Sequence, residues 1–247
     1  MYVKIALAAL GFVNKDINHN KMVIIDTLNN LKNKVDIVLF GEAFLQGFDS
    51  LSFDYEKDKY IPLSIYSDVI RGIIETAKNN QIAVSFGFIE KEDNKVYSSQ
   101  LTIDSEGNIV NLYRRVSKGW KETYATEEYC EGSSFSSFSY MDKRIAVGLC
   151  GDLWYDENID GIKKMNADII FWPVYTDFNY EKWNNEIKYE YLEQASKINS
   201  DVLYVNSYCI DKDEKEIAKG GAILFSKGKI ISEIPAGKED ILIVKID

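Results

Sequence analysis

The sequence has a single histidine, His19, among its 247 residues. His19 lies in a polar segment that is typical of the start of a helix, which argues against a catalytic cysteine–histidine pair. The three cysteines contain no C-x-x-C pair, so neither a disulfide framework nor a zinc site is expected. This cysteine usage suits a reducing compartment, and we expect a cytoplasmic protein.

Long hydrophobic runs and positive charge are also lacking. No stretch approaches the roughly 20 apolar residues of a membrane helix. The apolar N-terminus has Tyr2 and Lys4 alternating with apolar residues and no basic leader, which predicts a strand and not a signal peptide. A formal net charge of −10 argues against nucleic-acid binding, because phosphate contact needs clustered lysine and arginine. We therefore expect neither a membrane nor a nucleic acid as partner.

Proline is scarce, with three residues, and there is no linker of proline, glycine and serine. The chain is long enough for one sizeable core, and we expect a single domain over residues 1–247. Apolar patterns predict strands at 2–10, 35–40, 83–89, 96–103, 109–116, 135–140, 144–149, 167–173, 202–209, 221–225, 230–234 and 241–246. They predict helices at 20–33, 64–79, 159–166 and 180–199. The alternation indicates an α/β fold with helices covering the outer faces of buried sheets.

The strongest chemical signal is a cysteine at the end of a buried strand. The apolar run 145–149 ends at Cys150-Gly151-Asp152, which favours a sharp turn that presents one reactive side chain. A thiol attacks only as thiolate, so a neighbouring group must accept its proton. Because histidine is excluded, a carboxylate base and a cation are required. A lone cysteine is otherwise more often a small buried hydrophobe, and Cys130 and Cys209 are interpreted in that way.

Two other strand ends supply the missing groups. Glu42 directly follows a buried strand, where desolvation can raise the pKa of a carboxylate and suit it to act as a general base. A cationic segment at 113–122 leaves the end of a later strand and could stabilise an oxyanion. Taken singly, Glu42 could be a simple helix cap or ion-pair partner, and the basic segment a solvated loop.

In this order, the glutamate, the cationic segment and the cysteine resemble the nitrilase superfamily of carbon–nitrogen hydrolases. Residues 40–48 resemble its glutamate motif, with Gly41 in the place of proline. Residues 107–115 resemble the hairpin before its lysine, and residues 149–154 its Cys-x-Asp motif. Residues 166–173 are similar to its Gly-Ala-Asp strand that ends in proline. The resemblance extends over essentially the whole chain.

The resemblance implies a four-layer α-β-β-α sandwich with Glu42 as general base and Cys150 as nucleophile. It implies that a lysine stabilises the oxyanion and that no metal or organic cofactor is needed. It also implies a small-molecule amide as substrate and a homodimer or higher homo-oligomer. The aromatic-rich helix predicted at 180–199 could form that contact, with packing on the sheet as the alternative.

One position departs from the family pattern. Arg115 stands where the family has its lysine, and an arginine differs from a lysine in size and geometry. Either Arg115 serves, or Lys118 or Lys121 reaches the site from the following loop. Lys121 is preferred, because Trp120-Lys121-Glu122 resembles the family loop that carries an auxiliary glutamate. On that interpretation, Glu122 positions the cation or the substrate.

The leading function is a thiol amidase that releases ammonia or an amine. A carbamoyl amide or a nitrile is an alternative substrate that the motifs do not distinguish. Two other functions stay open: a catalytically weakened homologue that binds a small amide, which Arg115 supports, and a subunit that supplies ammonia to a synthetase.

Overall fold

The computed structural model describes residues 2–211 and 217–247. Two six-stranded sheets pack face to face, in the orders β14-β1-β3-β4-β5-β6 and β13-β12-β10-β9-β8-β7. The first sheet contains β1 (Val3–Ala9), β3 (Ile37–Phe40), β4 (Ala83–Glu92), β5 (Lys95–Ile103), β6 (Ile109–Arg114) and β14 (Asp240–Ile246). The second contains β7 (Ser137–Tyr140), β8 (Lys143–Val147), β9 (Ile169–Val174), β10 (Asp201–Asn206), β12 (Ala222–Ser226) and β13 (Lys229–Ile234).

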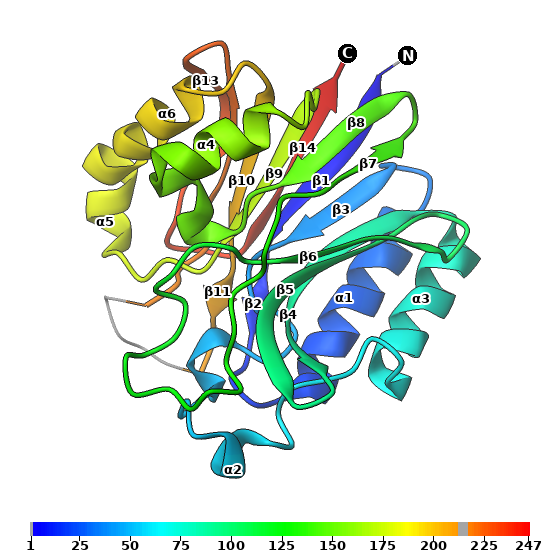
Figure 1. Cartoon of the computed structure of the whole chain (residues 1–247). Helices are drawn as coiled ribbons and strands as arrows, with labels where there is room; N and C mark the ends of the chain where they lie inside the picture. The colour runs from blue at the N-terminus through cyan, green and yellow to red at the C-terminus, as the bar shows by residue number, and fades with distance from the viewer. Residues whose placement is uncertain (1, 212–216) are drawn as a thin grey trace.

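Helices cover the outer face of each sheet (Figure 1). The first sheet is covered by α1 (Ile17–Leu31) and α3 (Asp68–Asn80). The second is covered by α4 (Asp156–Lys163), α5 (Tyr180–Lys182) and α6 (Lys188–Ser196). The predicted four-layer α-β-β-α sandwich is therefore confirmed. Among the described residues, no helix has the length and apolar character needed to cross a bilayer.

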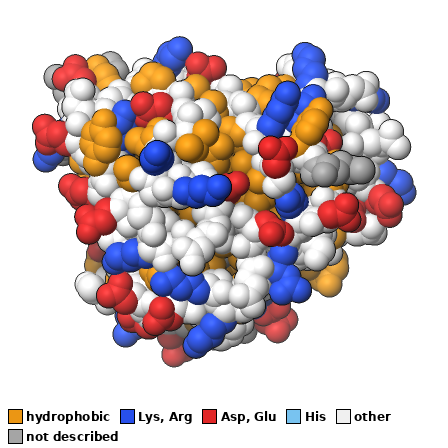
Figure 2. All heavy atoms as spheres, turned by 90° about the horizontal axis from the view of Figure 1, so that it is seen from above, with side chains coloured by type: hydrophobic (Ala, Val, Ile, Leu, Met, Phe, Trp, Pro, Cys, Tyr) orange, Lys and Arg blue, Asp and Glu red, His pale blue; other side chains and the backbone are white. Residues whose placement is uncertain are grey.

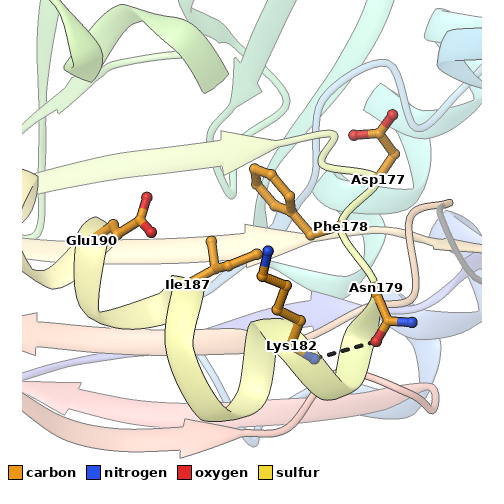
Figure 3. A pocket seen from close by; sticks show the side chains of 6 residues that line it. All are labelled: Asp177, Phe178, Asn179, Lys182, Ile187 and Glu190. Atoms are coloured by element: carbon orange, nitrogen blue, oxygen red, sulfur yellow. Dashed lines mark hydrogen bonds between the residues drawn. The ribbon is translucent and has the colours of Figure 1, made fainter.

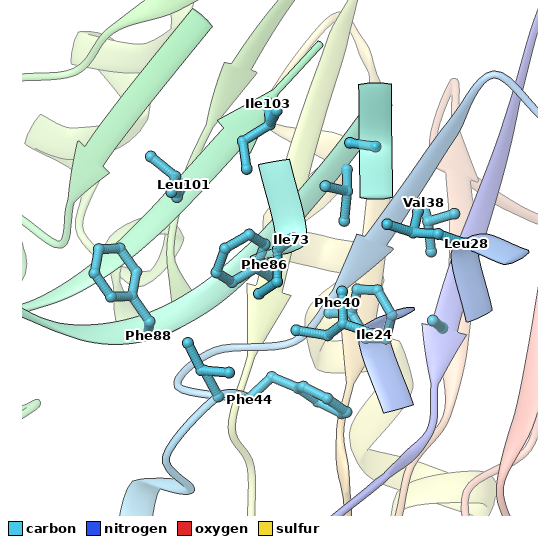
Figure 4. Packing of buried hydrophobic residues seen from close by; sticks show 14 of the residues in the cluster. Ile24, Leu28, Val38, Phe40, Phe44, Ile73, Phe86, Phe88, Leu101 and Ile103 are labelled. Atoms are coloured by element: carbon cyan, nitrogen blue, oxygen red, sulfur yellow. The ribbon is translucent and has the colours of Figure 1, made fainter. Parts of the chain in front are cut away.

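Three apolar layers hold the sandwich together. In β1, Ile5 and Leu7 point into the core between the two sheets, whereas Ala6 and Ala8 face α1 and α3. Because both faces are covered, the strand is apolar throughout and does not alternate with polar residues. Figure 4 shows the layer under α1 and α3, where Leu28 packs near Val38 and Ile24 near Phe40. Burial of each such side chain contributes about 1.5–3 kcal/mol.

The face that carries the chain termini is not dominated by one kind of side chain. Figure 2 looks down on this face, which lies at the top of Figure 1, and shows apolar side chains gathered between lysine, arginine and acidic groups. Both signs of charge are interspersed over it.

The helix predicted at 180–199 has an irregular centre. Between α5 and α6 lies a π-helical segment, Trp183–Ile187. Asn184 there exchanges two hydrogen bonds of 2.9 Å with the backbone of Ala236, which couples the helix to the chain after β13. The aromatic side chains divide between packing and exposure, since Trp183 and Tyr191 are buried on the sheet and Tyr189 is exposed.

The strand predicted at 202–209 also divides in two. Its second part, β11 (Tyr208–Cys209), leaves the sheet and pairs with the short strand β2 (Gly11–Phe12). The pattern also missed the short helix α2 (Tyr55–Asp58) and the 3₁₀ turn Phe48–Ser50, which lie in the long segment after Glu42.

Candidate active site

Glu42 lies just beyond β3, where the two sheets meet. Its backbone N–H donates to the carbonyl of Val174 at the end of β9, at 3.1 Å. The next residue, Ala43, has a positive φ of 49°, a conformation that side chains other than glycine adopt at a cost. Gly87 on β4 permits this turn, because a Cβ there would lie 2.3 Å from the Ala43 nitrogen. The turn aims the Glu42 side chain into the protein, where it is fully buried.

Three donors hold the Glu42 carboxylate, one from β5 and two from the residues that directly follow β6 and β9. Ser98 on β5 donates its hydroxyl to Oε1 at 2.8 Å, and Arg115 donates from Nη1 to the same oxygen at 3.1 Å. The backbone N–H of Tyr175, which follows β9, donates to Oε2 at 3.3 Å. A buried carboxylate needs such compensation, and these bonds fix its position.

Cys150 begins the 3₁₀ helix Cys150–Trp154 that follows β8. Its φ is 47°, so it occupies the left-handed region in which a non-glycine residue is strained. Its carbonyl accepts a 2.8 Å hydrogen bond from the indole Nε1 of Trp172, and its Sγ lies 3.5 Å from the carbonyl oxygen of Tyr175. The thiol is thus held at a sharp strand-to-helix turn.

The thiol of Cys150 stays protonated in the resting site. Burial, together with the negative charge of Glu42 and a hydrogen bond to it, raises the pKa of Cys150 to about 12. The positive charge of Arg115 acts in the opposite direction and lowers the pKa of Cys150. A base must therefore remove the thiol proton before or during attack.

Arg115 is the cation beside these two groups. Its Nε donates to the Ser117 hydroxyl at 2.9 Å, and a Cβ on Gly151 would lie 2.5 Å from its Nη2. Burial alone would lower the pKa of Arg115, but Cys150 and Glu42 outweigh it and raise the pKa above its ordinary value. The structure therefore brings Glu42, Arg115 and Cys150 together.

The other predicted cations point elsewhere. Lys121 forms an ion pair with Glu131 at 3.2 Å and donates to the carbonyl of Tyr129. Lys118 and Glu122 are exposed to solvent. Among the described residues, no hydrogen bond or ion pair joins Lys118, Lys121 or Glu122 to Glu42 or Cys150. The preference for Lys121 over Arg115 is therefore not supported by these contacts.

Asp152 connects the cysteine turn to the loop that carries Arg115. Its Oδ2 accepts from the backbone of Leu149 at 2.8 Å and from the Tyr113 hydroxyl at 2.6 Å. Its Oδ1 accepts from the backbone of Ser117 at 2.7 Å and of Val116 at 3.2 Å. Asp152 is fully buried, and its bonds fix the turn at Cys150 relative to the segment that carries Arg115.

Sequence reasoning missed Ser98 and Ser117, and it considered Trp172 as a core residue or as part of a pocket lining, not as a partner of the Cys150 backbone. One available signal was the polar pattern of β5, where Ser98 and Gln100 point to the same face of a strand in a buried sheet. Such buried polar side chains require partners, which here include the carboxylate of Glu42.

Residues of the segment that follows Tyr175 line a cavity of about 370 Å³ (Figure 3). Figure 3 shows Phe178 and the Lys182 side chain pointing toward its middle, with Asp177 and Glu190 on either side. The ring of Phe178 stacks on Trp183. Glu42, Arg115 and Cys150 do not line this cavity. No group of three or more metal-binding side chains was found within residues 2–211 and 217–247.

Comparison with known proteins places the sequence in one family. The sequence model of the family described as carbon-nitrogen hydrolase matches residues 4–247. An N-carbamoylputrescine amidase of rice (Oryza sativa subsp. japonica) is 27% identical over 184 residues, which are 69% of this chain and 58% of the rice protein.

Two solved structures share the fold at low identity. The glutamine-dependent NAD+ synthetase of Acinetobacter baumannii superposes with a TM-score of 0.82 at 18% identity, over 100% of this chain and 46% of that one. An amidase variant of Nesterenkonia sp. AN1, with acrylamide added at its active-site cysteine, has a TM-score of 0.76 at 15% identity, over 99% of this chain and 93% of that one. The chain thus spans about half of the length of some relatives and nearly all of others.

Proposed function

The chain belongs to the carbon-nitrogen hydrolase family, and we propose that it is an amidase that hydrolyses a small-molecule amide through a thioester on Cys150. One observation carries this proposal: the carboxylate of Glu42 pairs with the guanidinium of Arg115 at 3.1 Å and lies beside the thiol of Cys150, with Tyr175 bonded to both residues. A base, a nucleophile and a cation gathered at one site are the groups that acyl transfer requires.

In the first half-reaction, Glu42 accepts the thiol proton while sulfur attacks the amide carbon. The carbonyl electron pair moves onto oxygen, and Arg115 stabilises the resulting oxyanion together with the first backbone N–H groups of the turn at Cys150. The C–N bond then breaks, its electron pair leaves with nitrogen, and nitrogen takes the proton from Glu42. The products are ammonia or an amine and a thioester on Cys150.

In the second half-reaction, Glu42 accepts a proton from water while the water oxygen attacks the thioester carbon. The C–S bond breaks, and sulfur takes the proton back from Glu42. A carboxylic acid leaves, and the thiol and the carboxylate are restored. The chemistry of both steps is complete without a metal or a cofactor.

We assign the role of the cation to Arg115 and not to Lys121. The assignment is supported by the 3.1 Å contact of Arg115 with Glu42 and by the pairing of Lys121 with Glu131. Arginine stays protonated throughout, so it contributes charge but cannot exchange a proton with the substrate.

A weakened homologue that only binds an amide is the second candidate. The presence of Arg115 where the family has its lysine supports it, because an arginine differs from a lysine in size and geometry.

Ammonia release tests both candidates. Wild type, Cys150→Ala and the control Cys130→Ala would be incubated with small amides, carbamoyl compounds and nitriles. The amidase proposal predicts ammonia from an amide, its loss in Cys150→Ala and its retention in Cys130→Ala. Binding of an amide by wild type without turnover would instead support the second candidate.

A further inference from the structure

Trp172 makes a contact that packing alone does not require. It lies on β9, fully buried among aromatic side chains, with Tyr191 at 5.0 Å and Tyr204 at 6.0 Å between ring centroids. From this cluster, its indole N–H reaches the carbonyl oxygen of Cys150 at 2.8 Å. The next residue is Pro173, which restricts the backbone of Trp172 to an extended conformation. Packing in the aromatic cluster leaves the indole little freedom to turn away.

The direction of this carbonyl also sets the direction of an N–H group. In a trans peptide the C=O and the following N–H point to opposite sides. With the Cys150 carbonyl directed at Trp172, the N–H of Gly151 points away from the aromatic cluster. Gly151 is the second residue of the 3₁₀ helix, whose first N–H groups have no partner inside the helix. The guanidinium of Arg115 approaches Gly151 closely, since a Cβ there would lie 2.5 Å from Nη2.

The strained backbone of Cys150 makes such a constraint necessary. At a φ of 47° the backbone of Cys150 departs from regular helical geometry, and strain of this kind persists only where the surroundings enforce it. Rotation of that peptide would turn the Gly151 N–H away from the reacting carbonyl.

We propose that Trp172 is a positioning residue: by holding the Cys150 carbonyl, it directs the Gly151 N–H at the oxyanion that forms during amide hydrolysis. This inference rests on the proposed amidase function. Trp172 does not touch the substrate and acts only through the Cys150–Gly151 peptide.

The test compares Trp172→Phe, which removes the N–H and keeps an aromatic ring, with Trp183→Phe. Trp183 belongs to the same cluster, where it stacks on Tyr204, and within the described part of the chain no hydrogen bond joins its indole to Cys150. For each variant, kcat and KM for an amide and the rate of Cys150 alkylation by iodoacetamide would be measured. Alkylation needs the sulfur but forms no oxyanion, so it separates the two roles.

We expect Trp172→Phe to lower kcat about tenfold, as loss of one hydrogen bond would, while KM and the alkylation rate change less than about twofold. Trp183→Phe should change none of the three appreciably. A normal kcat in Trp172→Phe, or an equal loss of kcat and alkylation, would overturn the inference alone. Absence of hydrolysis by wild type would overturn the proposed function and this inference with it.

If Trp172→Phe does not fold, replacement of Trp172 by β-(3-benzothienyl)alanine keeps the ring shape and substitutes sulfur for the N–H. The same selective loss of kcat is expected, and an unchanged kcat would contradict the inference.

Discussion

Arg115 and Glu42 form a buried ion pair, with Nη1 and Oε1 separated by 3.1 Å and side-chain exposures of 6% and 0%. Each side chain compensates the buried charge of the other, and together they flank the thiol of Cys150. Removal of one partner leaves the other charged and unpaired in the interior, which costs about 3–5 kcal/mol in comparable pairs. Replacement of either residue is therefore expected to lower the stability of the protein as well as its activity.

Replacement of Arg115 tests which cation serves the reaction. Arg115→Met should lower kcat by about 10²–10³, because one stabilising group at the oxyanion is lost. Lys121→Met, which removes a cation paired with Glu131, should retain activity within about threefold. Ammonia release measures both variants. Strong loss in Lys121→Met with normal activity in Arg115→Met would restore Lys121 as the cation.

Replacement of Glu42 should increase the thiolate fraction of Cys150 and lower the rate of hydrolysis. Burial and Glu42 raise the pKa of Cys150 to about 12, so Glu42→Gln should lower that pKa and increase the thiolate fraction at about pH 9. Hydrolysis should be lost because the base is gone. Arg115→Met should move the pKa of Cys150 upward, since the arginine lowers it. The pH dependence of alkylation by iodoacetamide reports these shifts, and a higher pKa in Glu42→Gln would refute the account.

Asp152 is expected to be a stability hot spot. Four N–H and O–H groups donate hydrogen bonds to the Asp152 carboxylate. In Asp152→Asn, the side-chain NH₂ group would face some of these donors in place of an acceptor. The free energy of unfolding should fall by roughly 2–3 kcal/mol. The exposed Asp156, which pairs with Lys197, provides the control. Asp156→Asn should change the free energy of unfolding by less than about 0.5 kcal/mol. Urea unfolding measures both, and equal values for the two variants would contradict the role of Asp152.

Gly87 is expected to matter because the Glu42 turn leaves no room for a side chain. In Gly87→Ala, the new Cβ would lie 2.3 Å from the Ala43 nitrogen and 2.5 Å from the Gly41 carbonyl oxygen. Unfolding free energy should fall by about 1–3 kcal/mol, and activity should fall with it. In Gly72→Ala, the Cβ meets only the flexible end of Lys21, and the gain in helix propensity should leave stability equal or about 0.5 kcal/mol higher. Full activity in Gly87→Ala would show that the turn tolerates displacement.

The sequence predicted the parts of the site that a strand end determines. Glu42 and Cys150 each follow an apolar run, and runs of that kind form buried parallel strands whose ends meet. Whether Glu42 and Cys150 carry out catalysis stays a prediction until the experiments are done. Buried sheets with covering helices were predictable for the same reason, since burial on both faces leaves a clear pattern. Their arrangement in four layers was implied by the family resemblance.

The remaining parts depend on contacts between distant residues. The choice between Arg115 and Lys121 follows from the path of a loop, which residue spacing does not specify. The hydrogen bond from Trp172 to Cys150 joins two strand ends and depends on one side-chain rotamer. The π-helical segment at Trp183–Ile187 is tied to Ala236, far along the chain, so local helix periodicity carried no sign of it.

The most direct test of the central claim is the detection of an acyl group on Cys150. Wild type would be mixed with an amide that it hydrolyses, quenched rapidly in acid, digested and analysed by mass spectrometry. The account predicts that the peptide containing Cys150 gains the mass of the acyl group and that Cys150→Ala neither gains it nor releases ammonia. Ammonia release by Cys150→Ala at the wild-type rate, or an acyl group on another residue with Cys150 unmodified, would contradict it.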